Sequence, residues 1–274
     1  MIFNYVLRFS MFILGCILVA IALILFLIKE SQKKQYLSLQ SARSSDVAEL
    51  ITTANAIAND IGGGNWRDYV KLWGKILVDE PILSEIKQEP CVYYRMSVQR
   101  EYEEKVRSQD SEGKTVEKTV RKSETIAQNQ RSIPFIFKDK TGEVMVNPEG
   151  AKFDCIKILD EFRPEQPTGG LLQYDHFSYL LKNNPSHNQT LGYRYQEFIL
   201  PVNQEILLVG TVSDETGDLK ITKPLNHQEN FIISLKTDEA LSVDYLKRQA
   251  MLNYGIFGSL ATGIVLIVIN LLNN

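Results

Sequence analysis

The chain has 274 residues, with 30 Lys and Arg against 33 Asp and Glu and a formal net charge of -3. That balance lacks the basic excess that nucleic-acid-binding proteins use to neutralise phosphates, so we expect no nucleic-acid partner. Three cysteines are too few for a disulfide framework, and they leave the redox compartment open.

Two uncharged apolar runs, Phe9 to Ile28 and Tyr254 to Leu272, lie near the two ends of the sequence. About 20 apolar helical residues cross a hydrocarbon core of about 30 Å, and both runs meet that length. The first run is too long for the apolar part of a secretory signal, and no cleavage site follows it. We therefore expect a double-pass membrane protein.

These runs divide the chain into four expected segments. They are an N-terminal transmembrane anchor over 1–28, a polar stalk and amphipathic helix over 29–65, a β-rich soluble domain over 66–236, and a helix over 237–274 that continues into the second span. Basic residues flank the spans mainly on the domain side: Lys29, Lys33, Lys34, Lys247 and Arg248, against Arg8 on the other side. The excess predicts that the domain faces the cytoplasm.

The stretch after the stalk predicts a helix. Asp46 can cap it, Glu49 completes a capping box, and the run Gly62 to Gly64 can end it. Its apolar residues recur at helical spacing, and its polar face carries no basic residue, so packing on the domain is favoured over binding a membrane surface.

The domain itself shows the alternation of strands. Val92 to Val98 alternate apolar and polar side chains, and the turn sequence SQDSEGK then leads into a charge-rich return, which predicts a long hairpin with a solvated distal end. A second hairpin is expected around a turn at Lys140 to Gly142, and a short helix over Tyr174 to Lys182.

The rest of the domain reads as an antiparallel meander, after which Thr237 can cap a helix that runs unbroken into the second span. The expected fold class is α+β, with a predominantly antiparallel β domain between two transmembrane helices.

Several motifs in order resemble a known family. The segments EPILSEIKQEPCVYYRMSVQREYEE, VNPEGAKFD, LGYRYQEFILPVNQEILLVGTV, LKITKP and FIISLK, from about Trp66 to Leu235, resemble the membrane-flanked domain of the mitochondrial and chloroplast RING ubiquitin ligases of the MULAN/GIDE type. The resemblance implies a domain that engages partners or substrates beside a membrane. In mitochondria the family's domain lies in the intermembrane space, opposite to the side that the flanking charges predict.

The relatives carry a RING finger after the second span, whereas this sequence stops at Asn274. A RING needs eight Cys or His ligands for two zinc ions, and only three Cys and three His are present. We therefore expect no RING, no metal and no cofactor in this chain.

No complete catalytic motif is found, so no catalytic residue is assigned. His176, His187 and His227 lack the spacing of metal ligands. Cys91 is a candidate nucleophile if a base lies near it in space, but a small buried side chain is the commoner fate of such a cysteine.

Binding residues are expected among the aromatic and charged side chains of the family-like strands, because Tyr and Arg are frequent in binding hot spots. Strand alternation should send about half of this set into the core. The candidates are Tyr93, Arg95, Tyr193, Arg194, Tyr195 and Glu197.

In the second span, Gly255, Ser259 and Gly263 form a small-residue face suited to close packing against the first span or another copy of the chain. The favoured function is a non-catalytic module, embedded in the lipid bilayer, that binds an unidentified protein partner or substrate. The alternatives are the substrate-binding half of a split ubiquitin ligase and a membrane-anchored hydrolase that uses Cys91.

Overall fold

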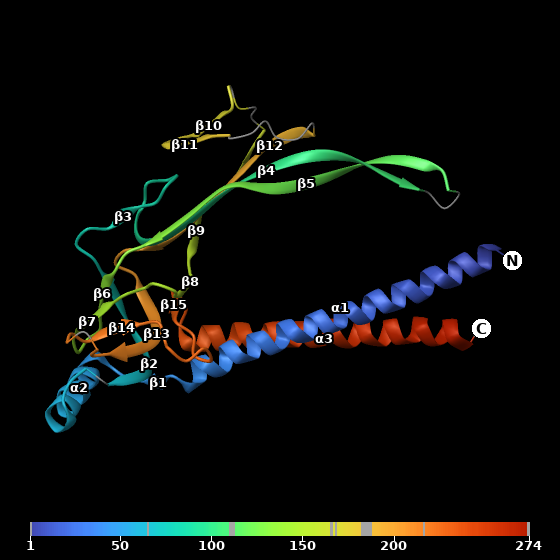
Figure 1. Cartoon of the computed structure of the whole chain (residues 1–274). Helices are drawn as coiled ribbons and strands as arrows, with labels where there is room; N and C mark the ends of the chain where they lie inside the picture. The colour runs from blue at the N-terminus through green and yellow to red at the C-terminus, as the bar shows by residue number, and fades with distance from the viewer. Residues whose placement is uncertain are drawn as a thin grey trace.

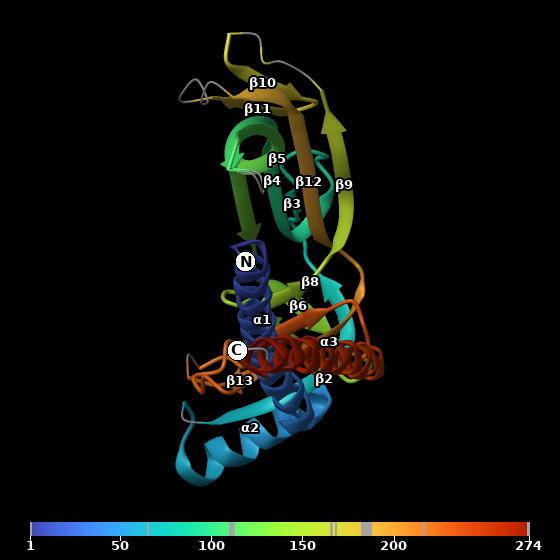
Figure 2. The same ribbon diagram turned by 90° about the vertical axis from the view of Figure 1, so that its right-hand side faces the viewer.

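The computed structural model describes residues 2–64, 66–109, 113–164, 167, 169–181, 188–215 and 217–272. Two long helices lie side by side and antiparallel, with both ends of the chain at their far tips and a β domain at their near end (Figures 1 and 2). They are α1 (Ile2–Ser41) and α3 (Asp238–Leu272). Both are long and apolar enough to cross a membrane. The expected class, a mostly antiparallel β domain flanked by two apolar helices, is confirmed.

Helix α1 does not end with its apolar run. It continues through the polar residues expected to form a stalk, as far as Ser41, so these residues are an extension of the helix. Near this end Ser38 and Leu39 are buried against the domain. Burial on the sheet supplies the stabilisation that a short polar segment lacks by itself.

Helix α3 begins as the sequence predicts. The Thr237 hydroxyl accepts a hydrogen bond from the amide of Ala240 at 3.2 Å, and the helix then runs without a break to Leu272. The expectation of one continuous helix from the domain into the second apolar run is confirmed.

A first sheet of eight strands adjoins the helices and holds the main core. Its order is β1-β2-β6-β7-β14-β13-β15-β8, and a further pairing of β2 with β13 closes five of these strands into a ring. The strands are β1 (Arg43–Ser44), β2 (Arg67–Leu77), β6 (Phe135–Lys138), β7 (Glu143–Val146), β8 (Lys152–Asp154), β13 (Glu205–Ser213), β14 (Lys220–Thr222) and β15 (Ile232–Ser234).

A second sheet of five strands rises from the first, in the order β3-β4-β12-β9 with β5 beside β4. Val92 and Leu200 of this sheet belong to the main core cluster, which joins the two sheets. The strands are β3 (Ile82–Leu83), β4 (Pro90–Gln109), β5 (Thr115–Ser132), β9 (Ile156–Arg163) and β12 (Gln189–Pro201).

Strands β4 and β5 form the predicted long hairpin. Strand β12 accompanies β4 only as far as Glu103, so residues 104–109 and 115–120 pair with one another alone. We call this distal part the arm. It extends from the domain in the same direction as the helix pair (Figure 1).

The prediction of a short helix over Tyr174 to Lys182 is wrong. Residues 171–180 form the hairpin β10 (Leu171–Tyr174) and β11 (Phe177–Leu180), while Lys182 lies outside the described residues. Asp175 adopts a left-handed φ of 45° in the two-residue turn, which aspartate tolerates better than most side chains. Packing of the hairpin on the second sheet, rather than local spacing, decides the structure.

The expected meander is also wrong in part. Strand β12 lies in the second sheet and β13 in the first, after a turn in which Asn203 has a φ of 59°. Strand β13 then pairs with both β14 and β15 as well as with β2. The chain changes sheets at Pro201, where a register shift interrupts the pairing of β12 with β4.

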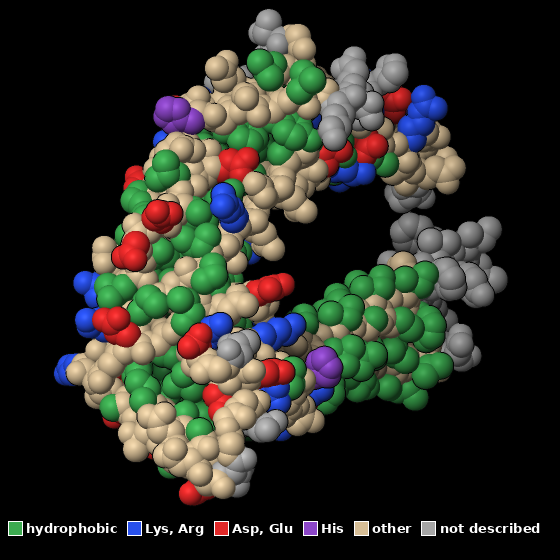
Figure 3. Space-filling view, turned by 60° about the vertical axis from the view of Figure 1, so that its left-hand side comes forward, with side chains coloured by type: hydrophobic (Ala, Val, Ile, Leu, Met, Phe, Trp, Pro, Cys, Tyr) green, Lys and Arg blue, Asp and Glu red, His purple; other side chains and the backbone are tan. Residues whose placement is uncertain are grey.

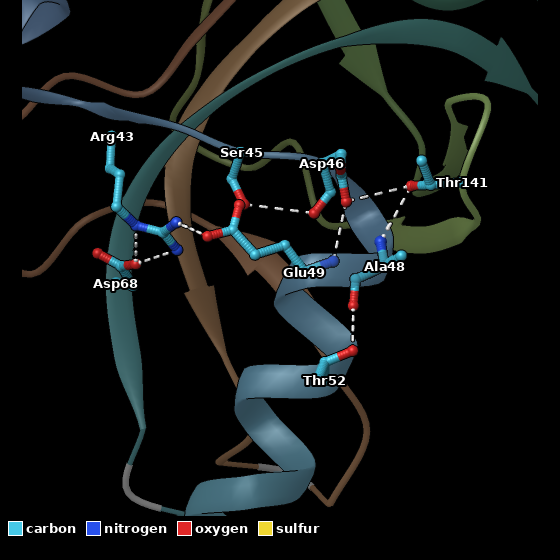
Figure 4. A network of polar contacts seen from close by, with 8 residues as sticks. All are labelled: Arg43, Ser45, Asp46, Ala48, Glu49, Thr52, Asp68 and Thr141. Carbon is cyan, nitrogen blue, oxygen red and sulfur yellow. Dashed lines mark hydrogen bonds and ion pairs between the residues drawn. The ribbon is translucent and has the colours of Figure 1, made fainter.

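Helix α2 (Val47–Ile61) packs its first turns on the first sheet, at the end of the domain away from the free tips of the helix pair (Figure 1). Its predicted cap is confirmed, because the Asp46 carboxylate accepts from the Glu49 amide at 2.8 Å, and Gly62 ends it with a φ of 88°. The Glu49 carboxylate binds Arg43 and Ser45, which ties the helix to β1 (Figure 4).

Candidate binding surface

The second sheet has one covered face and one open face. On the covered face, Tyr193, Tyr195 and Glu197 are buried beneath the loop 84–89 and the hairpin β10–β11. These three sequence candidates therefore lie in the interior. The ring of Tyr195 lies 4.6 Å from that of Tyr174, measured between centroids.

Glu197 is a buried carboxylate with a structural role. It accepts hydrogen bonds from the amides of Ile86 at 2.7 Å and Lys87 at 2.9 Å, and from the Ser84 hydroxyl at 3.2 Å. A buried charge with three donors is satisfied where it lies. It fixes the loop that covers this face of the sheet.

The open face carries the other candidates. We define it by five side chains that point away from the covered side: Arg95, Lys157, Asp160, Arg194 and Phe198. Arg95 is exposed and its guanidinium lies 4.7 Å from the centroid of the Phe198 ring. Among the described residues Arg95 has no ion pair, so its charge is available to a ligand.

Arg194 is held in place on the same face. It pairs with Glu101 at 3.0 Å and with Asp160 at 2.9 Å. Hydrogen bonds from Lys157 and then Arg194 lower the pKa of Asp160 to about 2, so this carboxylate stays charged throughout the physiological range. The open face is therefore a fixed pattern of charges around an aromatic ring.

Tyr93 connects this face to the base of the helix pair. It lies in phase with Arg95, is largely buried, and stacks on Phe153 of β8 with ring centroids 3.8 Å apart. Phe153 in turn lines a pocket together with Tyr36 of α1 and Tyr245 of α3. The open face therefore looks toward the helices. The space-filling view shows the hollow that results, with the arm on one side and the apolar helix pair on the other (Figure 3).

Sequence reasoning missed Arg100, which fixes the root of the arm. Its side chain is 1% exposed and donates to Thr190 at 2.7 Å, to Glu124 at 2.8 Å and to the carbonyl of Asn188 at 2.9 Å. Its phase with the buried residues Met96 and Val98 was the available signal. The neighbouring charges obscured that signal.

The cysteines show no sign of nucleophilic activation. Cys91 is fully buried against Tyr94 and Ile199, and Cys155 is partly buried. Burial raises the pKa of each thiol to about 12. Because the thiolate is the reactive form, this environment disfavours catalysis by Cys91.

The three histidines lie apart from this surface where they are described. His176 is exposed in the β10–β11 turn, His227 is exposed in a loop, and His187 falls outside the described residues. Within the described ranges, no group of three or more His, Cys, Asp or Glu side chains could hold a metal ion.

The small-residue face of α3 meets α1. A Cβ on Gly263 would lie 2.9 Å from the carbonyl oxygen of Gly15, and one on Gly255 would lie 3.2 Å from Leu25. Ser259 instead donates to the carbonyl of Gly255 in its own helix at 2.7 Å. Gly263 is buried, and the close approach of the two backbones at Gly15 and Gly263 depends on the absence of side chains.

A family model described as GIDE, E3 ubiquitin ligase, matches residues 103–268, which is more than half of the chain. The chain belongs to the GIDE family. The match includes the arm, β9, β12, the later strands of the first sheet and most of α3, so the resemblance seen in the sequence is confirmed. Neither curated proteins nor solved structures gave a match.

Proposed function

We propose that this GIDE-family chain is a double-pass membrane protein whose β domain binds a protein partner or substrate beside the bilayer without carrying out chemistry. The observation that carries the proposal is the open face turned toward the apolar helices, where Arg95 lies over Phe198 and has no ion pair among the described residues. Arginine and aromatic side chains dominate binding hot spots. A partner in the hollow would lie next to the membrane that holds α1 and α3.

Family membership suggests that the bound partner is a substrate for ubiquitin transfer. Zinc-dependent recruitment of a conjugating enzyme by a RING needs eight ligands, and these 274 residues hold three Cys and three His. We therefore assign recognition to this domain and place the transfer step outside these 274 residues, for example on a second chain as in a split ligase. The raised thiol pKa of Cys91 does not favour the alternative of a hydrolase.

A photocrosslinking amino acid at position 157 of the full chain, expressed in its native membrane, tests the assignment, because this exposed position lies on the open face and leaves Arg95 and Phe198 in place. The matched control carries the same group at Lys140, which is exposed beside the start of α2. Adducts with a protein are expected from position 157 and not from position 140. Two results would reject the open face as the binding surface. One is the same adducts from both positions, and the other is a yield of adducts no higher than that from the full chain without the photoreactive group.

Affinity provides a second comparison within the same system. In the chain that carries the photoreactive group at position 157, Arg95→Ala should weaken recovery of the partner by about thirtyfold, because truncating an interfacial hot spot costs about 2 kcal/mol. Arg107→Ala removes another exposed arginine, on the arm, and should leave recovery unchanged. Equal losses would indicate general electrostatic attraction instead.

A further inference from the structure

The base of the helix pair contains a pocket, lined by both polar and apolar side chains, that the proposed partner surface does not use. Its volume is about 350 Å³, and α1, α3, β8 and β15 all contribute to its walls. Gln32 and Tyr36 come from one helix, and Tyr245 and Arg248 from the other. The two tyrosine rings stack with centroids 4.2 Å apart, which holds the two helical walls together.

Among the cations that line the pocket, one is available to a ligand. Lys236 is paired with Asp244 at 2.8 Å, and Lys152 donates to Asn230 at 2.7 Å. Arg248 is exposed and forms no ion pair with the residues that the structure describes. The site therefore offers a guanidinium, which binds phosphate in a planar, often bidentate arrangement.

The pocket also contains a hydrogen-bond acceptor without a donor. The Oε1 atom of Gln32 is buried and has no hydrogen-bond partner within the described part of the chain. A buried acceptor of this kind costs stability unless a donor fills the site. A ligand that satisfies the pocket would carry both a phosphate for Arg248 and an N–H or O–H group for Gln32.

The position of these two side chains indicates where such a ligand resides. Gln32 lies four residues beyond Ile28, or about 6 Å along the helix, and Arg248 lies six residues before Tyr254, or about 9 Å. The headgroup layer of a bilayer is about 5 to 7 Å thick on each side, and long basic side chains reach into it from above. Both side chains are therefore at the height of lipid headgroups when the apolar runs span the hydrocarbon.

We infer that this pocket binds the headgroup of a glycerophospholipid that has a hydrogen-bond donor, such as ethanolamine, glycerol or serine, rather than choline. Arg248 binds the phosphodiester, and Gln32 accepts from the terminal amine or hydroxyl. This assignment rests on the membrane anchoring proposed above, and it adds a lipid ligand at the floor of the hollow in which the partner is expected.

The test uses the full chain in nanodiscs that contain equal amounts of phosphatidylcholine and phosphatidylethanolamine, with lipids retained after release identified by native mass spectrometry. The wild type should retain phosphatidylethanolamine preferentially. Arg248→Gln should reduce retention about tenfold, the loss expected for one charge-assisted hydrogen bond, whereas Arg248→Lys should keep part of it. Gln32→Leu should abolish the preference over phosphatidylcholine.

Lys247→Gln is the matched control. It removes the same charge at the neighbouring residue, and the side chain of Lys247 does not line the pocket. Equal effects of Lys247→Gln and Arg248→Gln would overturn the site in favour of general attraction to the membrane. Binding of inorganic phosphate to detergent-solubilised chain, dependent on Arg248 and without retained lipid, would overturn the lipid assignment. Extraction of the wild-type chain from membranes by alkaline carbonate would instead contradict the anchoring.

Discussion

Burial determines the chemistry of the thiols of Cys91 and Cys155. Each has a pKa raised to about 12, because an apolar environment stabilises the neutral thiol over the thiolate. At pH 8 roughly one thiol in ten thousand would therefore be ionised. The apolar surroundings that favour the packing of these side chains also keep their thiols protonated and therefore unreactive.

We expect a thiol reagent at pH 8 to leave Cys91 unmodified in the folded chain, with modification appearing after denaturation or as the pH approaches 12. Peptide mass spectrometry would follow each cysteine separately. Rapid modification at neutral pH, lost in Cys91→Ser, would revive the hydrolase hypothesis. Cys91→Ala would keep the partner adducts formed from position 157 if the domain acts by binding alone.

Alternation along β4 and β12 correctly predicts two faces, but it does not tell which one is covered. Tyr195 and Arg194 are neighbours in the sequence, and the hairpin β10–β11 together with the loop 84–89 buries the first and leaves the second accessible. The cover comes from residues whose own spacing also fits a helix. Local patterns therefore yield the strands, the caps and the long hairpin, whereas the binding face depends on contacts between distant segments.

At the scale of elements, the packing of α1 on α3 depends on the missing side chain at Gly263. Gly263→Leu would place atoms where the backbone of Gly15 lies, and overpacking of this kind costs about 1 to 3 kcal/mol. Gly258→Leu is the matched control in the same span, because a Cβ there meets nothing within 4 Å.

The expected result is a lower unfolding temperature in detergent and a greater distance between spin labels on α1 and α3 for Gly263→Leu alone. If both variants change the unfolding temperature and the helix distance by the same amount, the contact between Gly15 and Gly263 is not what holds the helices together. Repeating these measurements at several protein concentrations separates packing within the chain from self-association, because only self-association depends on protein concentration.

At the scale of the whole molecule, the antiparallel helix pair places both ends of the chain at the tips opposite the β domain. In a protease-protection assay on the membrane-inserted chain, tags on the two ends should therefore both be protected or both be digested. The β domain should be digested when the tags are protected, and protected when they are digested. The flanking basic residues predict that the domain is digested from the cytoplasmic side. Tags on opposite sides would refute two spans, and a domain protected in the cytoplasmic assay would match the family's placement instead.

Side-chain contacts join the domain to both helices. Ser38 of α1 contacts the Tyr69 hydroxyl at 2.8 Å, and Lys71 of β2 forms an ion pair with Asp238 at the start of α3. A tilt of the helix pair is thus passed to the sheets as a rotation of the whole domain, including the open face.

The arm is expected to limit the rotation of the domain relative to a membrane. It extends in the same direction as the helices, yet it carries ion pairs such as Arg107 with Glu117, and charged side chains are costly within hydrocarbon. Beyond Glu103 it is a two-stranded ribbon, the most pliant part of the second sheet. If the two helices span a bilayer, we expect the ribbon to lie on the lipid surface beside them. The domain would then touch the membrane at two separate places, which would limit its rotation about the helix axis and keep one side of the hollow toward the lipid.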